Sequence, residues 1–144
     1  MPRAEARIAI NRSPEDVFAF VTDIRETPRW RRPHVLEADW LDEGEARVGA
    51  RFRIVREFHG RRVDVVCEIT AWEPPNRFAY RMAEGPVDLE AAYQWEPQSG
   101  GCRFTIVGAD PAVVKWYARQ TRQDLQTLKN LLENRAGGHA ASAV

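Results

Sequence analysis

Residues 51–73 read RFRIVREFHGRRVDVVCEITAWE, and the alternation of apolar and polar residues along this stretch decides the fold class. Successive side chains of a β-strand point to opposite faces, so a period of two predicts strands over 51–58 and 61–73. His59-Gly60 lies between them and favours a tight hairpin turn, because glycine accepts a positive φ. The stretch therefore predicts an antiparallel hairpin with one face in a core.

The same period of two continues on both sides of this hairpin. Residues 3–11 alternate and predict a first strand. Turns rich in proline and glycine separate the later segments, and their short lengths favour an antiparallel meander with one apolar, aromatic face and one charged face. Strands are expected near 35–42, 51–58, 61–73, 77–83, 87–97 and 102–108.

Two short helices are predicted after the first strand. Ser13 is a suitable N-cap and Pro14 a suitable first helical residue, so a helix is expected over 14–22. Asp23 begins a second short helix that ends before Pro28, because the residue before a proline avoids the α region.

A long C-terminal helix is predicted over 111–135. Gly137-Gly138 ends it, and residues 136–144 are expected to form a flexible tail. The chain has no internal repeat or linker, so we expect one domain over 1–135. One apolar stripe recurs at spacings of four and three residues and comprises Val114, Ala118, Thr121, Leu125, Leu128 and Leu132.

Composition excludes several classes of protein. The 144 residues have a net charge of zero at pH 7, which excludes nucleic-acid binding through bulk positive charge. Cys67 and Cys102 are too few for a disulfide scaffold or a zinc finger. No apolar run predicts a secretory signal or a membrane span, so we expect a cytoplasmic protein without stable membrane insertion.

The predicted sheet is broader than the helix that covers it. A helix is about 10–12 Å across, which is narrower than a twisted sheet of this width. Bulky side chains or a ligand must fill the remaining groove. A void limited to a few water molecules there would remove the basis for both a carrier and a cyclase.

Short motifs accompany the predicted order of one strand, two short helices, six strands and a long helix. They are Ile8-Ala9-Ile10, Ser13-Pro14-Glu15-Asp16-Val17-Phe18, Val21-Thr22-Asp23, Pro28-x-Trp30, Val48-Gly49-Ala50-Arg51-Phe52, Glu68-Ile69-Thr70-Ala71-Trp72-Glu73-Pro74-Pro75, Glu96-Pro97, Gly100-Gly101-Cys102-Arg103 and Leu128-Lys129. In this order, the elements and motifs resemble the helix-grip fold of the START/Bet v 1-like (SRPBCC) superfamily, and specifically its polyketide cyclase/dehydrase and lipid transport group. The resemblance implies an α+β fold with a seven-stranded antiparallel curved sheet wrapped around the C-terminal helix. That superfamily includes carriers, cyclases, hormone receptors and co-chaperones.

The strand order of that fold places Cys67 and Cys102 far apart. Two other strands would lie between the strand of Cys67 and the strand of Cys102. At roughly 4.8 Å per strand, the two cysteines would then be about 14 Å apart. A disulfide requires Cα atoms within about 7 Å. The resemblance therefore implies two free thiols.

Aromatic and polar residues on the core-facing side of the predicted strands form the candidate ligand site. A single ring there is more often simple core filling, but the tyrosine hydroxyls need partners, which a ligand or water supplies. Arg56 has two interpretations: a bidentate contact to a ligand oxyanion, or a buried stem with its head in water or paired with a glutamate. The candidate lining residues are Trp30, Phe52, Ile54, Arg56, Phe78, Tyr80, Leu89, Tyr93, Trp95, Tyr117 and Thr121.

Catalytic and cofactor motifs are absent from the sequence. None of His34, His59 and His139 lies on a predicted inner face, which argues against a nucleophile–histidine pair. No metal-binding or nucleotide-binding motif occurs, so no cofactor and no metal are expected. Arg31 and Arg32 are interpreted as part of a solvated surface.

These observations leave three hypotheses about function. The first is binding of a small hydrophobic or amphipathic molecule, such as a lipid, isoprenoid or polyketide, in an internal cavity between sheet and C-terminal helix. The second is a polyketide cyclase or dehydratase that uses the same cavity. The third is a protein–protein interaction module, and Val113 and Trp116, which lie off the apolar stripe, make a homodimer contact possible.

Overall fold

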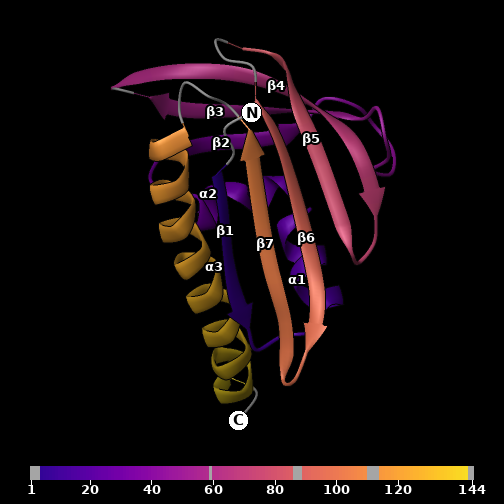
Figure 1. Ribbon diagram of the computed structural model, residues 1–144, viewed down its shortest axis with the longest axis vertical. Coiled ribbons are helices and arrows are strands. Elements are labelled where there is room, and N and C mark those ends of the chain that lie inside the picture. The colour runs from indigo at the N-terminus through magenta and orange to yellow at the C-terminus, as the bar shows by residue number, and fades with distance from the viewer. Residues whose placement is uncertain (1–3, 59, 86–88, 110–113, 143–144) are drawn as a thin grey trace.

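The computed structural model describes residues 4–58, 60–85, 89–109 and 114–142 (Figure 1). For residues 4, 58, 109, 114–118 and 135–142 the description covers the backbone alone. The elements in chain order are β1 (Ala4–Ile10), α1 (Pro14–Val21), the 3₁₀-helix η1 (Ile24–Glu26), α2 (Thr27–Trp30), β2 (Val35–Trp40), β3 (Arg51–Phe58), β4 (Arg61–Glu73), β5 (Arg77–Glu84), β6 (Glu90–Gln98), β7 (Gly101–Ala109) and α3 (Val114–Ser142).

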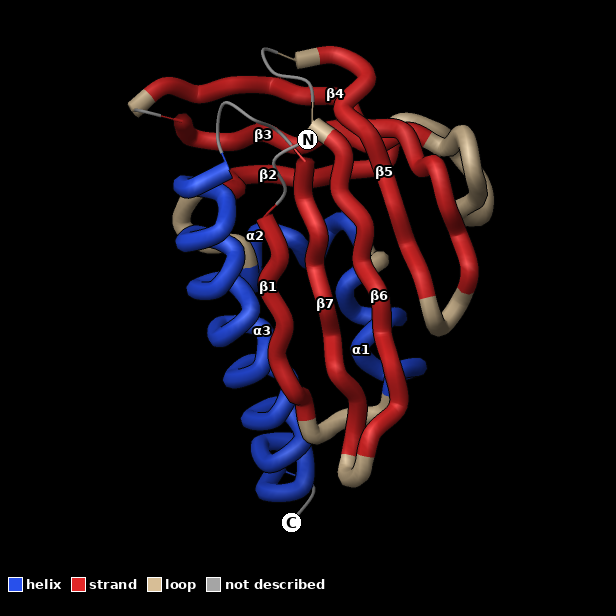
Figure 2. The backbone as a smooth tube through the Cα atoms, viewed as in Figure 1, coloured by secondary structure: helices blue, strands red, loops and turns tan. Residues whose placement is uncertain are grey.

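All strands belong to one antiparallel sheet. Its order is β1-β7-β6-β5-β4-β3-β2, so the first strand pairs with the last and the others follow as a meander. Figure 2 shows β1, β7 and β6 along the long axis, whereas β2 and β3 cross the top of the view, because the sheet curls. The helix α3 lies along the β1 edge. The expected seven-stranded curved sheet with a long C-terminal helix is confirmed.

The predicted start of α1 is confirmed, but the predicted end of the second short helix is wrong. Ser13 caps α1, with its hydroxyl oxygen accepting a hydrogen bond from the Asp16 backbone N–H at 3.1 Å. The helical path continues from η1 into α2 and passes through Pro28. Proline is tolerated there because it occupies the first turn of α2, where its missing N–H would have no partner inside the helix.

The long helix extends farther than the glycines predict. The sequence predicts an end near residue 135, whereas α3 continues to Ser142. A glycine inside a helix costs only about 1 kcal/mol relative to alanine, so Gly137 and Gly138 do not by themselves terminate it. The domain boundary at residue 135 stays a prediction.

The concave face of the sheet is apolar, and one irregularity in β4 changes which residues reach it. The register shifts between Ile69 and Ala71, which leaves Thr70 as an extra residue. Trp72 then packs its ring against Phe18, with ring centroids 5.2 Å apart. A strict period of two would place Trp72 with the charged residues of the other face. The bulge therefore adds an aromatic side chain to the core.

The convex face carries cross-strand ion pairs. Arg81 donates to Glu68 at 2.6 Å and Arg103 donates to Glu96 at 2.7 Å, and all four side chains are largely exposed or half-exposed. Charged pairs of this kind keep one face of an antiparallel sheet hydrated. The predicted division into an apolar and a charged face is correct for the described strands.

Two further features bear on the stability of the sheet. A Cβ atom placed on Gly101 would lie 2.0 Å from the carbonyl oxygen of Ile10, so β1 and β7 approach too closely for any larger residue. Cys67 on β4 and Cys102 on β7 are free and buried, with β5 and β6 between their strands, as expected.

Among the helices that the structure describes, none is long and apolar enough to cross a bilayer.

Candidate functional site

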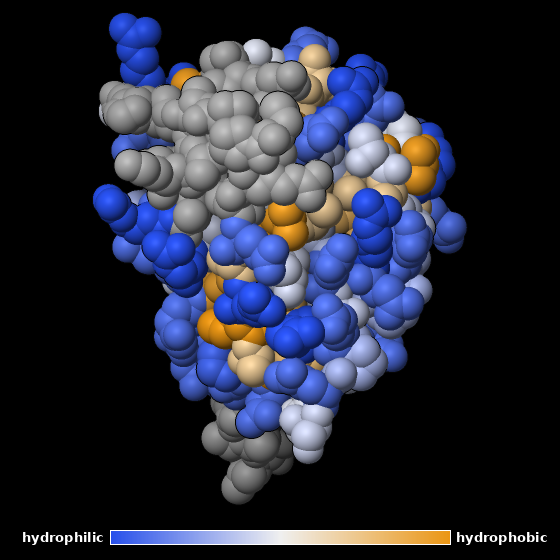
Figure 3. Space-filling view, viewed as in Figure 1, coloured by the Kyte–Doolittle hydropathy of each residue, from blue (hydrophilic) through white to orange (hydrophobic). Residues whose placement is uncertain are grey.

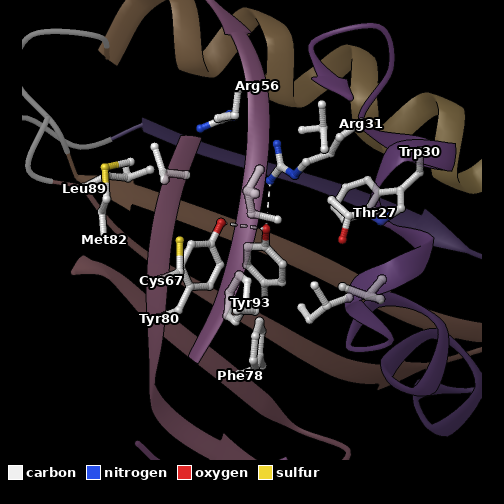
Figure 4. Close-up of a pocket in the computed structure, with 16 residues that line it drawn as sticks. Thr27, Trp30, Arg31, Arg56, Cys67, Phe78, Tyr80, Met82, Leu89 and Tyr93 are labelled. Carbon is white, nitrogen blue, oxygen red and sulfur yellow. Dashed lines mark hydrogen bonds between the residues drawn. The ribbon is translucent and has the colours of Figure 1, made fainter. Parts of the chain in front are cut away.

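A cavity lies against the concave face of the sheet, and the residues after β1 cover it. Val21, Ile24, Thr27 and Trp30 line it from α1, η1 and α2, facing strands β3 to β6. Of the residues of α3 whose side chains are described, none lines this cavity. The sequence analysis expected the cavity to lie between the sheet and the C-terminal helix; residues 119–134 of α3 do not line this cavity, and the side chains of residues 114–118 lie outside the described residues. The other lining residues are Arg31, Val35, Phe52, Ile54, Arg56, Val65, Cys67, Phe78, Tyr80, Met82, Leu89 and Tyr93 (Figure 4).

The cavity is small. The space open to the centres of water molecules is about 30 Å³, which suffices for a few ordered waters. Side chains therefore fill most of the groove that the sequence analysis expected to be hollow. By the criterion set in the sequence analysis, a void of this size gives no basis in empty space for a carrier or a cyclase. A larger molecule enters only if lining side chains move, so either function has to rest on the polar groups of the lining.

Most of the candidate lining residues do surround this cavity. They are Trp30, Phe52, Ile54, Arg56, Phe78, Tyr80, Leu89 and Tyr93. Trp95 is buried elsewhere: its ring stacks on Phe104 with centroids 4.8 Å apart, and Phe18 of α1 covers it. Thr121 is buried but does not line the cavity. The side chain of Tyr117 lies outside the described residues.

A buried polar cluster, which the sequence analysis missed, adjoins the cavity. Asp124 of α3 is 1% exposed and accepts a hydrogen bond from Arg31 Nη1 at 2.9 Å on Oδ2. His34 Nε2 lies 2.8 Å from the same oxygen, and Gln120 Nε2 donates to Oδ1 at 3.0 Å. Arg31 and His34 side chains are only 4% and 6% exposed. Placing Arg31 on the surface and His34 away from the inner face was therefore wrong.

The chain between α2 and β2 brings these side chains inward. The Val35 backbone N–H donates to the Arg31 carbonyl at 2.9 Å, which holds a tight reversal after α2. The guanidinium of Arg31 then lies over the Trp30 ring, 4.7 Å from its centroid, in a cation–π contact. One sequence signal could have revealed the cluster: Asp124 lies three residues after Thr121 and four before Leu128, which is the spacing of the apolar stripe.

His34 is held as a neutral imidazole. Burial lowers its pKa below 6.5, and the nearby Arg31 and Arg56 lower it further, while the hydrogen bond to Asp124 opposes them. A neutral ring that donates from Nε2 to the Asp124 carboxylate keeps a lone pair on Nδ1. Arg56 Nη2 lies 3.4 Å from Nδ1 and donates to it. Arg56 is thus half-buried at the cavity wall, with its head directed towards His34.

Two tyrosines connect this cluster with the cavity. Arg31 Nη2 donates to the Tyr93 hydroxyl at 2.9 Å, and the hydroxyls of Tyr93 and Tyr80 lie 3.1 Å apart. Figure 4 shows the two hydroxyls pointing towards each other, with Arg31 above them. A guanidinium next to a phenol polarises its O–H, so the pair offers polar contacts inside an otherwise apolar lining.

The thiol in the lining is not activated. Burial raises the pKa of Cys67 to about 12, although Arg56 opposes this shift. The thiol is therefore protonated near neutral pH and is a poor nucleophile. Across the residues with described positions, no group of three or more His, Cys, Asp or Glu side chains is arranged to hold a metal ion.

Comparison with known proteins identifies the family and the fold. A family model described as "Polyketide cyclase / dehydrase and lipid transport" matches residues 1–133. No protein with a curated description matches the chain. TTHA0849 from Thermus thermophilus is similar in structure, with a TM-score of 0.74 at 20% identity, covering 90% of this chain and 95% of the other.

Two other solved structures share the fold. Ara h 8.0201 has a TM-score of 0.72 at 15% identity, covering 92% of this chain and 98% of that protein. The di-domain ARO/CYC BexL, from the BE-7585A biosynthetic pathway, has a TM-score of 0.74 at 20% identity. That match covers 94% of this chain and 48% of BexL, so this chain spans about half of the di-domain protein.

Proposed function

Because the chain belongs to the polyketide cyclase/dehydrase and lipid transport family, we propose that it binds a small amphipathic molecule in the cavity beneath α2 and η1. The apolar part of the molecule would contact Phe52, Phe78 and Leu89, and its polar end would face Tyr80 and Tyr93. The coarse assignment to a ligand-binding fold follows from the family, while this particular site is our proposal.

The observation that carries the proposal is the polar cluster at the cavity wall. Burying the charges of Arg31 and Asp124 costs several kcal/mol per ion before their mutual attraction is counted, and apolar residues of similar volume often serve stability equally well. A core selected for stability alone has no need of this pair. The cluster instead presents the Tyr93 hydroxyl, held by Arg31, to a lining that is otherwise mainly aliphatic and aromatic. Binding pockets commonly combine apolar walls with a few placed polar groups.

The small volume sets the size of the first ligands to consider. Met82 lies in the wall and has three rotatable side-chain bonds, so it can change shape at low cost. Arg56 also has a long flexible side chain. Molecules with one ring or a short chain can enter by displacing these two side chains, whereas a long-chain lipid would require the covering helices to move.

Native mass spectrometry of the purified protein tests the proposal. The expected result is a non-covalent adduct that is released on denaturation, or saturable binding of 1-anilinonaphthalene-8-sulfonate to the folded protein. Val65→Phe would fill the cavity and should reduce binding at least about tenfold. Val66→Phe places the same ring on the neighbouring residue, which does not line the cavity, and is the matched control. Equal binding by both variants, with circular dichroism showing both folded, contradicts the proposed site.

A polyketide cyclase or dehydratase is the second candidate function. The Tyr93 hydroxyl, hydrogen-bonded to a guanidinium, is suited to polarise a carbonyl, and holding a flexible chain in a reactive geometry lowers the barrier further. The likeness in fold to BexL is in keeping with this candidate. Turnover of a linear poly-β-ketone, lost in Tyr93→Phe and Arg56→Ala, would favour it. Unchanged turnover in both variants would reject these polar groups as its machinery.

The third hypothesis, a protein–protein interaction module, has less support. Figure 3 shows one face of the molecule, and on its described residues hydrophobic side chains form small separate areas among hydrophilic ones. Val113 and the side chain of Trp116 lie outside the described residues. The homodimer and the cytoplasmic location both stay predictions.

A further inference from the structure

Among the described residues of the cavity lining, the polar side chains either only donate hydrogen bonds or both donate and accept them. The lining contains the guanidinium groups of Arg31 and Arg56 and the indole N–H of Trp30, which donate and cannot accept. The hydroxyls of Thr27, Tyr80 and Tyr93 can do both. Among the described lining residues there is no aspartate, glutamate, asparagine or glutamine. A ligand that needs strong acceptors would therefore find few.

The Asp124 carboxylate, which lies near the cavity, is already used. Asp124 does not line the cavity, and its two oxygens together receive Arg31, His34 and Gln120. Arg31 binds Asp124 through Nη1 and the Tyr93 hydroxyl through Nη2, so the carboxylate holds the guanidinium in place. Asp124 is therefore a positioning residue.

Trp30 provides an independent observation. Its side chain is 1% exposed and lines the cavity, yet its Nε1–H has no hydrogen-bond partner among the described atoms. A buried donor without a partner is costly, and few remain in folded proteins without a reason. Trp95 also has a buried Nε1 without a described partner, but it lies outside the cavity. Trp30 thus lines the cavity and Trp95 does not, which makes the Trp30 indole the candidate donor to a molecule bound there.

We propose that the ligand presents a hydrogen-bond-accepting oxygen, as in a ketone, an enolate or a carboxylate, to Trp30 Nε1 and to the one hydroxyl of the Tyr80–Tyr93 pair that does not donate to the other. The site disfavours ligands whose polar end is a protonated amine, because an ammonium group only donates and would meet the donor groups of Trp30, Arg31 and Arg56. This inference rests on the proposed function and specifies the ligand chemistry of the same site.

A nuclear magnetic resonance titration with three matched probes tests the inference. The probes are 2-heptanone, heptanoate and heptylamine, which share a chain and differ in the polar end. Met82 is a direct reporter of occupancy, because the chain has only two methionines and the other is Met1. Its ¹³C-labelled methyl group should shift when any probe enters the cavity. The ¹⁵N-labelled indole of Trp30 reports whether the probe accepts a hydrogen bond, and the indole of Trp95 is the internal control.

The expected result is that 2-heptanone and heptanoate shift both Met82 and the Trp30 indole proton, the latter downfield, while Trp95 stays unchanged. Heptylamine should bind at least about tenfold more weakly. Shifts at Met82 without a shift at Trp30, or equal binding of heptylamine, would overturn the inference and leave the proposed function standing. If no probe shifts Met82, the proposed function fails and the inference fails with it.

Trp30→Phe provides a second measurement, since it keeps an aromatic ring and removes only the N–H group and part of the indole. The dissociation constant of 2-heptanone should rise about three- to tenfold, which corresponds to one hydrogen bond. Trp95→Phe should leave it unchanged. Equal dissociation constants for the wild-type protein and a folded Trp30→Phe variant would overturn the contact. The titration of the wild-type protein decides the question even if a variant does not fold.

Discussion

Replacing Asp124 with asparagine keeps the shape of the side chain and removes the negative charge that faces Arg31. Both side chains are almost fully buried: that of Arg31 is 4% exposed and that of Asp124 is 1% exposed. Water cannot compensate the guanidinium at that depth. Removing one partner of a buried pair typically costs about 3–5 kcal/mol. Because asparagine still offers one oxygen to Arg31, we expect the lower end, a loss of about 3 kcal/mol in the free energy of unfolding.

Urea-induced unfolding, followed by tryptophan fluorescence, measures this loss. The matched control is Asp64→Asn, which removes the same charge from an exposed pair with Arg53 at 3.3 Å. Pairs exposed to this extent contribute at most about 1 kcal/mol. The transition midpoint should therefore fall much further for Asp124→Asn, with unchanged dependence on urea concentration. A loss no larger than that of the control would refute the claim that the Arg31 charge is buried and compensated by Asp124.

A double variant separates the charge from the packing. Arg31→Met combined with Asp124→Leu removes both charges and retains apolar volume. Replacement of a complete buried pair by apolar residues is often neutral or stabilising. The double variant should consequently be more stable than Asp124→Asn. If it is less stable than the single variant, the polar contacts themselves, rather than the balance of charge, hold α3 against α2.

Three other predictions concern protonation, thiol reactivity and close packing. Burial keeps the pKa of His34 in the folded protein below 6.5, its value in the unfolded chain, so the unfolded chain binds a proton first as the pH falls. The contribution of the neutral His34 to stability is therefore complete above pH 6.5 and is lost as the pH falls towards the folded pKa. Between pH 7.5 and pH 5.5, the free energy of unfolding measured with urea should fall less for His34→Gln than for the wild-type protein. An equal fall in both proteins would contradict this. Burial raises the pKa of Cys67 to about 12 and that of Cys102 to about 11, so both thiols should react with 5,5′-dithiobis(2-nitrobenzoate) at least about a hundredfold more slowly in the folded than in the unfolded protein. Rapid native reaction would show that one of them is accessible. Gly101→Ala should destabilise the protein by about 3 kcal/mol, because the added methyl group meets backbone. Gly85→Ala meets chiefly the flexible end of a side chain and should cost less; the reverse order in thermal denaturation would argue against the close approach of β1 and β7.

The sheet could be predicted from the sequence because its signal is local. Alternation over 51–73 specifies both the strand and the face that each side chain occupies, and the turns between strands are short. The same signal fails at Trp72, where the bulge at Thr70 changes the phase. A bulge adds one residue without a distinctive composition, so the alternation alone does not reveal it.

The candidate site was predicted less completely, for a different physical reason. Aromatic residues on the inner phase, such as Phe78 and Tyr93, follow from the strand pattern and do line the cavity. Arg31 and His34 lie between elements, where no periodicity indicates the direction of a side chain. Their burial depends on Asp124, some ninety residues away in the chain, which supplies the partner that each of them needs. Only a tertiary contact could show this.

The cluster of Arg31, His34 and Asp124 connects α2, the start of β2 and α3, whereas the opposite wall of the cavity belongs to the sheet. This division has a consequence for redesign. Substitutions at Met82 or Leu89 would alter which molecules are accepted while leaving the attachment of the helices intact. Changes at the three charged or titratable positions would have to be made together, so directed evolution of new specificity should accumulate substitutions on the strand side first.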